Sequence, residues 1–308
     1  MSARTTVGEQ AIRVRGLRKS YGPLEAVRGI DLTIERGEVF ALLGPNGAGK
    51  TTTVEILEGF RRRDAGEVAV LGFDPSRGER ALRERIGIVL QQAGLDPHLT
   101  VRETVQMYGG YYPRPRRAQE VLDVVGLGEK TDARVDRLSG GQRRRLDVAV
   151  ALAGDPEVLF LDEPTTGFDP GARRNAWDLV RDLAALGKTV LLTTHYMDEA
   201  QTLANRVAVI VRGEIVAEGP PATLADRHLA QTVIRFRTPR GTPLFPARLA
   251  AMRATSDGVT ELLTAEPTSV LHELTGWALE AGVELGGLEV TRPSLEDVYL
   301  QLTEGADE

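Results

Sequence analysis

The stretch Val39-Phe40-Ala41-Leu42-Leu43-Gly44-Pro45-Asn46-Gly47-Ala48-Gly49-Lys50-Thr51 decides the fold of this chain. Its first five residues are apolar, which is typical of a strand buried on both faces of a parallel sheet. The next eight match the pattern GxxxxGK[ST], whose glycines let backbone N–H groups crowd around phosphates because no Cβ intervenes. A helix expected from about 49 to 60 would add its positive N-terminal end. The stretch therefore predicts a phosphate-binding strand, loop and helix.

Two side chains of this loop carry specific expectations. Lys50 would reach the β- and γ-phosphates of a nucleotide, and the hydroxyl of Thr51 would bind Mg²⁺. The other residues of the predicted phosphate site are Gly44, Pro45, Asn46, Gly47, Ala48, Gly49 and Thr52.

Two carboxylates follow a second apolar run. Val158–Leu161 is typical of a buried strand, and Asp162 and Glu163 come directly after it. Because the carboxyl ends of parallel strands face the ligand crevice, both side chains are expected near the phosphate site. Asp162 could hold Mg²⁺ directly or through water, and Glu163 could polarise an attacking water as general base. The alternative is a surface pair that only caps the strand.

The motif Leu138-Ser139-Gly140-Gly141-Gln142 predicts a second exposed helix start. Ser139 suits an N-cap, and the two glycines bare the backbone. One nucleotide already has its cradle in residues 44–51, so a second phosphate contact from Ser139, Gly140, Gly141 and Gln142 suggests a nucleotide clamped between two chains. By itself the motif is only a helix start. The following arginines, 143–145, are more typical of a solvated helix face than of a phosphate site.

Apolar runs alternate with helical patterns over most of the chain, which indicates an α/β fold with a mainly parallel sheet. Further strands are expected at Ile86–Leu90, Val190–Thr194 and Val207–Val211. Helices are expected at about 101–108, 116–125, 141–153, 172–186 and 197–204. Residues 95–150 are helix-rich and predict a helical subdomain. Short strands at Ile12–Val14 and Leu32–Ile34 predict an antiparallel β subdomain.

A turn at Gly219-Pro220-Pro221 and a last helix to about His228 precede a second unit. We therefore expect one domain over 1–228 and a small C-terminal α+β domain over 229–308. The expected strands of this second domain are 232–237, 259–264 and 283–290, and its expected helices are 246–254, 268–281 and 293–303.

Composition narrows the class of protein. The 308 residues are 42% hydrophobic and 27% charged, which is ordinary for a globular protein with a large core. The net charge of −6 disfavours a nucleic-acid binder, and the absence of cysteine excludes disulfides and Cys-ligated metal sites. No apolar run reaches the length of a membrane-spanning helix, and the polar N-terminus does not look like a signal peptide. Any membrane role is therefore expected to come through a partner.

Together, these motifs make residues 11–225 resemble the ATP-binding subunits of ABC transporters. The resemblance implies a P-loop NTPase core that binds ATP with Mg²⁺ and hydrolyses it. Two further stretches, Thr193–Ala200 and Pro293–Leu300, are similar to exporter ATPases of the daunorubicin-resistance type.

The resemblance also implies roles for single residues. Tyr21 corresponds to the aromatic that stacks on adenine, although it could also be a half-buried turn tyrosine. Gln91 matches the glutamine that touches Mg²⁺ and reports to the membrane partner, with Gln92 as an adjacent competitor. Asp169 matches the aspartate of the dimer-contact loop, and His195 the histidine that contacts the γ-phosphate. The implied catalytic set is Glu163, His195 and Gln91, and the implied metal ligands are Thr51, Gln91 and Asp162.

The implied partners are a second copy of the chain, closed head to tail over two ATP molecules, and a separate integral-membrane permease. The permease would dock near residues 93–104 and place the chain at the cytoplasmic face of the membrane. The implied cargo is a drug, an antibiotic or a lipid-like compound for export, and no nucleic acid is expected. The C-terminal domain could brace the dimer, dock the partner or regulate it.

Two other classes of function fit the sequence less well. A soluble ABC-type ATPase acting on ribosomes or DNA is the first. It is disfavoured because the chain holds one ATPase unit, has an acidic balance, and leaves too few residues between Lys50 and Ser139 for a long coiled coil. A P-loop kinase or GTPase is the second. It fits poorly because no Asn-Lys-x-Asp sequence is present and the Ser-Gly-Gly-Gln motif would be unexplained.

Overall fold

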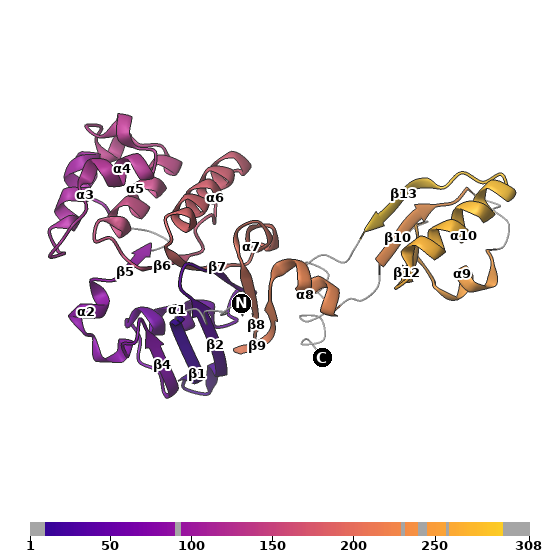
Figure 1. The fold of residues 1–308 in the computed structure, drawn as a ribbon, viewed down its shortest axis with the longest axis horizontal. Coiled ribbons are helices and arrows are strands. Elements are labelled where there is room, and N and C mark those ends of the chain that lie inside the picture. Colours follow the sequence, from indigo (N-terminus) through magenta and orange to yellow (C-terminus); the bar gives the residue numbers. More distant parts are fainter. Residues whose placement is uncertain (1–9, 90–93, 229–231, 240–244, 257–258, 292–308) are drawn as a thin grey trace, which may run out of the picture. The chain divides into compact units, whose positions relative to one another are not determined.

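The computed structural model describes residues 10–89, 94–228, 232–239, 245–256 and 259–291. The chain divides into two compact units, Met1–Pro220 and Pro221–Glu308. Figure 1 labels most of the helices and strands of both units.

A six-stranded sheet forms the centre of the first unit, with the order β5-β6-β7-β3-β8-β9. Five strands are parallel, and only β9 runs antiparallel to its neighbour. Every residue of β3 is buried, as its uniformly apolar sequence predicts. The strands are β3 (Val39–Leu43), β5 (Ile86–Val89), β6 (Val158–Asp162), β7 (Thr189–Thr194), β8 (Arg206–Val211) and β9 (Glu214–Gly219).

A second, antiparallel sheet with the order β2-β1-β4 completes the β structure of this unit (Figure 1). Its strands are β1 (Gln10–Tyr21), β2 (Leu24–Glu35) and β4 (Ala65–Val70). β1 and β2 are much longer than the short pieces expected at 12–14 and 32–34. The register of β1 shifts between Val14 and Leu17, around Gly16 with its positive φ, so apolar residues do not alternate along the whole strand.

One apolar core joins the two sheets through helix α1 (Lys50–Glu58). Ile12 of β1, Phe40 of β3 and Phe160 of β6 are all fully buried in it, together with Ile56 and Leu57 of α1. The core therefore fixes where α1 starts, at the end of the loop that follows β3.

A partly buried charge cluster also connects the two sheets. The guanidinium of Arg206, at the start of β8, lies 3.1 Å from Glu38 Oε1 and donates to the carbonyl oxygen of Thr33 in β2. It also pairs with Glu218 of β9 and lies over the ring of Phe40. An arginine can donate in several directions at once, so this one side chain connects the antiparallel sheet with the central one.

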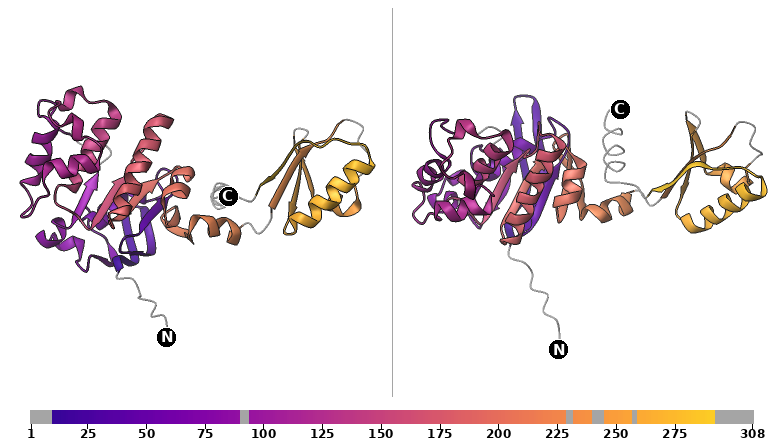
Figure 2. Two further views of the ribbon diagram at one scale, coloured as in Figure 1. Left: turned by 45° about the horizontal axis from the view of Figure 1, so that its top comes forward. Right: turned by 90° about the horizontal axis from the view of Figure 1, so that it is seen from above.

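Most of the remaining helices of the first unit lie in two places. Helices α3, α4 and α5 gather in one lobe, which reaches two residues beyond the expected range 95–150, while α6 and α7 follow strands β6 and β7 (Figures 1 and 2). The bounds are α2 (Arg80–Arg83), α3 (Val101–Gly109), α4 (Ala118–Val124), α5 (Gly140–Leu152), α6 (Pro170–Ala185) and α7 (Met197–Leu203). Short 3-10 helices lie at Pro75–Arg77, Gly128–Lys130 and Val135–Arg137.

The second unit contains a four-stranded antiparallel sheet with the order β11-β12-β10-β13. Helix α10 lies along one face of this sheet (Figure 2) and buries Val270 and Leu274 against Ile234, Phe236 and Leu262. The elements are α8 (Pro221–His228), β10 (Thr232–Arg237), α9 (Ala247–Ala251), β11 (Arg253–Ser256), β12 (Val259–Thr264), α10 (Pro267–Glu280) and β13 (Gly286–Thr291). A single helix was expected over 246–254, but the chain forms a short helix and then β11, which pairs with β12. The helix expected at 293–303 lies outside the described residues.

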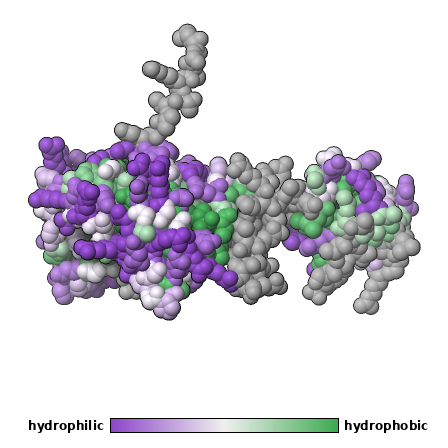
Figure 3. Space-filling model, turned by 90° about the horizontal axis from the view of Figure 1, so that it is seen from below, coloured by the Kyte–Doolittle hydropathy of each residue, from purple (hydrophilic) through white to green (hydrophobic). Residues whose placement is uncertain are grey.

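No helix in the described part of the chain is long and apolar enough to cross a membrane. The face of the first unit seen from below is mostly hydrophilic, with smaller hydrophobic patches (Figure 3).

Substituting Phe160 tests how strongly the first unit depends on its shared core. We expect Phe160→Ala to lower the free energy of unfolding by about 3–5 kcal/mol, because it leaves a cavity under the central sheet. Urea unfolding in a Trp277→Phe background would report on this unit alone, since Trp177 is then the only tryptophan. The control is Tyr111→Ala, which removes an aromatic ring that is 73% exposed. Equal losses from both variants would contradict this account of the core.

Candidate active site

The loop between β3 and α1 takes the conformation that its glycines allow. A Cβ at Gly44 would lie 2.3 Å from the carbonyl oxygen of Ile210. Gly49 has a φ of +104°, and its Cβ would lie 2.4 Å from the carbonyl oxygen of Ala26. Both positions therefore need glycine, because the loop runs closely past neighbouring backbone. The loop ends at Lys50, where α1 begins and where the first N–H groups have no partner within the helix.

Lys50 lies buried under this loop. Its Nζ donates to the carbonyl oxygen of Gly44 at 2.8 Å and lies 3.5 Å from Glu163 Oε1. Burial lowers the pKa of Lys50, and the nearby carboxylate only partly offsets this effect. The ammonium group thus contacts the backbone of the loop that the sequence predicts to bind phosphate.

Three parallel strands bring the charged groups of the site together. Lys50 follows β3, Glu163 follows β6 and His195 follows β7, and these strands are neighbours in the order β6-β7-β3. His195 Nδ1 lies 3.4 Å from Glu163 Oε1, the same oxygen that faces Lys50. The predicted lysine and the predicted histidine therefore both lie within 3.5 Å of the predicted glutamate.

Glu163 is held in an unusual backbone conformation. Its φ is +44°, in the left-handed region that residues with a Cβ rarely adopt. Its N–H donates to Thr193 Oγ1 at 3.0 Å, and its carboxylate accepts a hydrogen bond from Thr166 Oγ1 at 3.0 Å. Such strain persists only where the surroundings enforce it, and it is common at functional sites. The two threonines thus orient this carboxylate.

The pKa of Glu163 lies below its ordinary value. Burial raises the pKa, but the hydrogen bond from Thr166 and the charges of Lys50 and His195 together outweigh burial. The carboxylate is therefore ionised at neutral pH and can accept a proton.

Asp162 lies beside Glu163 at the end of β6 and accepts a hydrogen bond from Thr193 Oγ1 at 2.5 Å. Thr193 thus donates to one acidic residue and accepts from the backbone of the next, a link that the sequence analysis did not identify. Its only signal was its position as a polar residue at the end of an otherwise apolar strand.

A cavity of about 270 Å³ opens beside the phosphate loop. Tyr21, at the end of β1, lines this cavity, and its hydroxyl oxygen lies 3.5 Å from Thr52 Oγ1. The guanidinium of Arg61 lies 5.2 Å from the centre of the Tyr21 ring, a contact that the sequence analysis missed. The predicted residues that line the cavity are Tyr21, Asn46, Gly47, Gly49, Lys50, Thr51, Thr52 and Glu163.

The donor set fits a nucleotide with Mg²⁺. Thr51, in the first turn of α1, offers a hydroxyl, and Asp162 offers a carboxylate, which are the hard oxygen ligands that Mg²⁺ prefers. Among the described residues, no three His, Asp or Glu side chains form a metal site of their own. Gln91, the third predicted ligand, and its competitor Gln92 lie outside the described residues.

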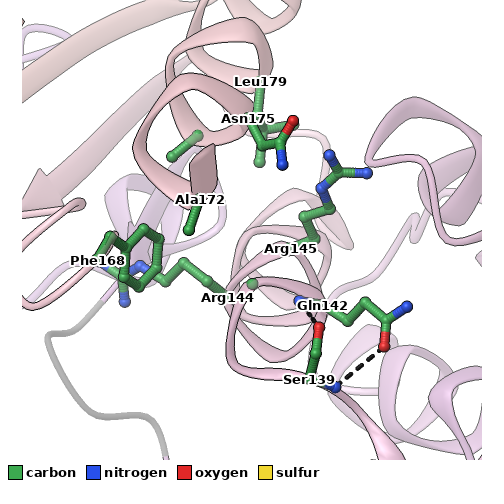
Figure 4. Close-up of a pocket in the computed structure, with 10 residues that line it drawn as sticks. Ser139, Gln142, Arg144, Arg145, Phe168, Ala172, Asn175 and Leu179 are labelled. Atoms are coloured by element: carbon green, nitrogen blue, oxygen red, sulfur yellow. Dashed lines mark hydrogen bonds between the residues drawn. The ribbon is translucent and has the colours of Figure 1, made fainter. Parts of the chain in front are cut away.

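The Ser139 motif lies elsewhere in the same protomer. Ser139 caps α5: its Oγ accepts from the N–H of Gln142 at 3.3 Å, and Gln142 Oε1 accepts from the N–H of Ser139 at 3.0 Å (Figure 4). Together with Gly141, they line a cavity of about 260 Å³ between α5 and α6. In the described chain this cavity shares no lining residue with the cavity beside the phosphate loop.

Glycines 140 and 141 are not required by the protomer itself. Neither has a positive φ, and a Cβ at either position would meet no atom within 4 Å in the rest of the described chain. This contrasts with Gly44 and Gly49, where a Cβ would collide with backbone. The surface at the start of α5 is therefore bare backbone that faces open space.

Asp169 caps the next helix. Its Oδ1 accepts from the N–H groups of Gly171 at 2.8 Å and Ala172 at 3.0 Å, at the start of α6. The hydrogen bond from Ala172, which has the larger effect, and the one from Gly171 hold the pKa of this exposed carboxyl below its ordinary value. Phe168 beside it lines the cavity between α5 and α6 (Figure 4).

Comparison with known proteins agrees with this geometry. Residues 27–166 match the family model described as "ABC transporter", and residues 232–294 match that of the "ABC transporter domain-containing protein-like, C-terminal domain". The chain is 41% identical to daunorubicin resistance ATP-binding protein DrrA3 of Streptomyces coeruleorubidus, covering 96% of this chain and 97% of that protein. It is 43% identical to Nod factor export ATP-binding protein I of Rhizobium sp. (strain N33), covering 95% and 97%.

Among solved structures, the chain is similar to that described as the dimeric structure of MJ0796, a bacterial ABC transporter cassette. The TM-score is 0.60 with 28% identity, covering 68% of this chain and 98% of that one. The likeness in sequence therefore extends over both units, and the likeness in structure confirms the predicted P-loop NTPase fold. The chain belongs to the ABC transporter family, as one of its ATP-binding, ATP-hydrolysing subunits.

Proposed function

We propose that this chain hydrolyses ATP at Glu163 and thereby drives an exporter whose membrane-spanning part is a separate protein. The meeting of Lys50, Glu163 and His195 at the end of three neighbouring strands carries the proposal. These groups combine a cation for the phosphates with a base for water, which is what phosphoryl transfer to water requires.

The ionised Glu163 carboxylate would orient a water molecule and accept its proton as the water oxygen attacks the γ-phosphorus. The bond between the γ-phosphorus and the bridging oxygen then breaks, and ADP leaves with that oxygen. Lys50 would turn from the loop carbonyls to the β- and γ-phosphates, and His195 would contact the γ-phosphate. When bound, Mg²⁺ would neutralise charge on these phosphates, held by Thr51 and Asp162 and, by resemblance, by Gln91.

Two copies would complete each site. Gly140 and Gly141, at the start of α5, are not required by steric contacts within their own protomer, and Gly141 lines another cavity than the phosphate loop does. A helix N-terminus of this kind attracts anions. We therefore propose that Ser139, Gly140, Gly141 and Gln142 of one copy contact ATP held by the loop of the other, with Asp169 at the same interface. The dimeric relative supports this arrangement.

The membrane partner follows from the family and from the described part of the chain, in which no helix could span a bilayer. We propose an integral-membrane permease that docks near residues 93–104 and holds the chain at the cytoplasmic face. The two relatives, one named for daunorubicin resistance and one for Nod factor export, favour export of a drug, an antibiotic or a lipid-like compound.

Removing the proposed base tests the chemistry. We expect Glu163→Gln to lower kcat by about 10²–10⁴-fold, because the amide cannot accept the proton. The affinity for ATP should change little, since the loop and Lys50 remain. Phosphate release and equilibrium ATP binding measure the two effects. Glu214→Gln, at an exposed glutamate of β9, is the control. Near-normal hydrolysis by Glu163→Gln would remove Glu163 from this role.

Mixing two inactive variants tests the composite site. Lys50→Met should disable the phosphate loop, and Gly141→Asp should repel the phosphates without disturbing its own protomer, where the added Cβ meets open space. Each variant alone should be nearly inactive. An equimolar mixture should recover roughly one quarter of wild-type activity, because half of the dimers are mixed and each then keeps one intact site.

Steady-state ATPase assays across mixing ratios measure this recovery, with Lys50→Met mixed with itself as control. Absence of recovery with both variants folded, or full activity of Gly141→Asp alone, would contradict head-to-tail sharing of the site.

Affinity purification from detergent-solubilised membranes tests the partner. We expect the tagged chain to bring down an integral-membrane protein with several spanning helices in stable proportion, because the chain in its described part has no span of its own. The control is an unrelated cytoplasmic protein that carries the same tag. Recovery with ribosomes or with DNA, and not with a membrane protein, would instead favour the soluble ABC-type ATPase.

A further inference from the structure

Glu199 is a fully buried carboxylate next to the proposed site. It lies in α7, one helical turn after His195, and none of its surface is exposed. Burying a carboxylate is unfavourable unless it is hydrogen-bonded, and glutamate is rarely found at this depth without partners. Packing alone therefore does not explain a glutamate at this position.

A single oxygen of Glu199 joins two other segments. Its Oε1 accepts a hydrogen bond from Thr165 Oγ1 at 2.8 Å and from Trp177 Nε1 at 3.2 Å. Thr165 belongs to the loop that runs from Glu163 to Asp169, and Trp177 belongs to α6, which starts at Asp169. One carboxylate thus connects the segment after β7 with both parts of the segment after β6.

A second set of contacts links the same segments, α6 and the segment after β7; we call this link the α6–α7 joint. Arg173 of α6 donates to Asp198 Oδ2 at 3.0 Å, and its guanidinium lies 4.2 Å from the centre of the Tyr196 ring. The ring of Tyr196 in turn lies 4.0 Å from that of His195. His195 therefore contacts both Glu163 and Tyr196, and Tyr196 is itself in contact with Arg173 of α6.

We infer that Glu199 is a positioning residue that fixes His195 relative to Glu163 and to the start of α6. The inference rests on the proposed function, because it concerns the geometry of the groups assigned there. Since Asp169 is the N-cap of α6 and lies on the proposed dimer interface, a shift of α6 when the second copy docks reaches Glu199 through Trp177. The joint then couples closure of the dimer to the position of His195.

Two substitutions at Glu199 separate positioning from folding. Glu199→Leu removes both acceptors and should lower kcat at least about tenfold, because a displacement of about 1 Å can reduce a rate about 10²-fold. The KM for ATP should change by less than about twofold, since Lys50, Thr51 and Tyr21 are untouched. Glu199→Gln keeps an oxygen that can accept both hydrogen bonds and should retain kcat within about threefold of wild type. The stoichiometry of ATP binding gives the fraction of folded protein, and each kcat is calculated for that fraction.

Two milder variants test the same joint if Glu199→Leu does not fold. Trp177→Phe keeps the ring and loses the N–H donor, and Thr165→Val keeps the shape and loses the hydroxyl. Each should lower kcat with little change in KM. The double variant should lose less activity than the sum of the two single losses, expressed as free energies, because both substitutions affect the same contact. The control is Thr189→Val, at a buried threonine whose hydroxyl accepts from the N–H of Gly37 at the opposite end of β7.

Three results would overturn the inference. The first is a kcat for folded Glu199→Leu within about twofold of wild type, and the second is an equal defect in Glu199→Gln and Glu199→Leu. The third is an effect of Thr165→Val and Trp177→Phe no larger than that of Thr189→Val. Each of these outcomes leaves the proposed function intact if Glu163→Gln is inactive, whereas an active Glu163→Gln variant would refute the proposed function itself.

Discussion

The close packing of β6, β7 and β3 is the constraint on which the site depends. Parallel strands end at the same edge of a sheet, so the residues that follow them meet there whatever their distance along the chain. Lys50, Glu163 and His195 share one contact oxygen for this reason. Glu163 takes a left-handed backbone conformation at this edge, and Thr193 of the adjacent strand holds its N–H in place. The strain at Glu163 is therefore supported by the sheet that creates the site.

The two glycine-containing segments that we propose to contact ATP are built differently. Gly44 and Gly49 are glycines because the phosphate loop passes close to other backbone of the same chain. Gly140 and Gly141 face open space, so the lack of a side chain there matters only to something outside the protomer. This difference supports the proposed head-to-tail dimer on steric grounds. It also makes the joint between α6 and α7 important, because α6 starts at the proposed interface and contacts the segment of His195.

Much of the first unit could be predicted because strands such as β3 and β6 are apolar almost throughout, and because helices such as α3 and α5 begin at a threonine or serine cap. The phosphate loop, the Asp162–Glu163 pair and His195 were found from motifs, and the structure brings them together, although their individual roles stay predictions. The long strands β1 and β2 were not predicted in full, because a register shift at Gly16 breaks their alternation. Thr193, Arg61 and Glu199 were missed as site residues, since each acts through a neighbour that is distant in sequence.

The sequence by itself determined the family and the α/β class, and it predicted the phosphate-binding and acidic residues, because these features depend on local patterns of glycine, lysine and carboxylate in short segments. Only the tertiary structure decided that Thr193 serves both acidic residues, that Tyr21 lies beside Thr52, and that a buried Glu199 joins three segments. It also separated the Ser139 cavity from the phosphate loop within one protomer. These facts depend on strand order and helix packing, which arise from long-range burial that no short motif encodes.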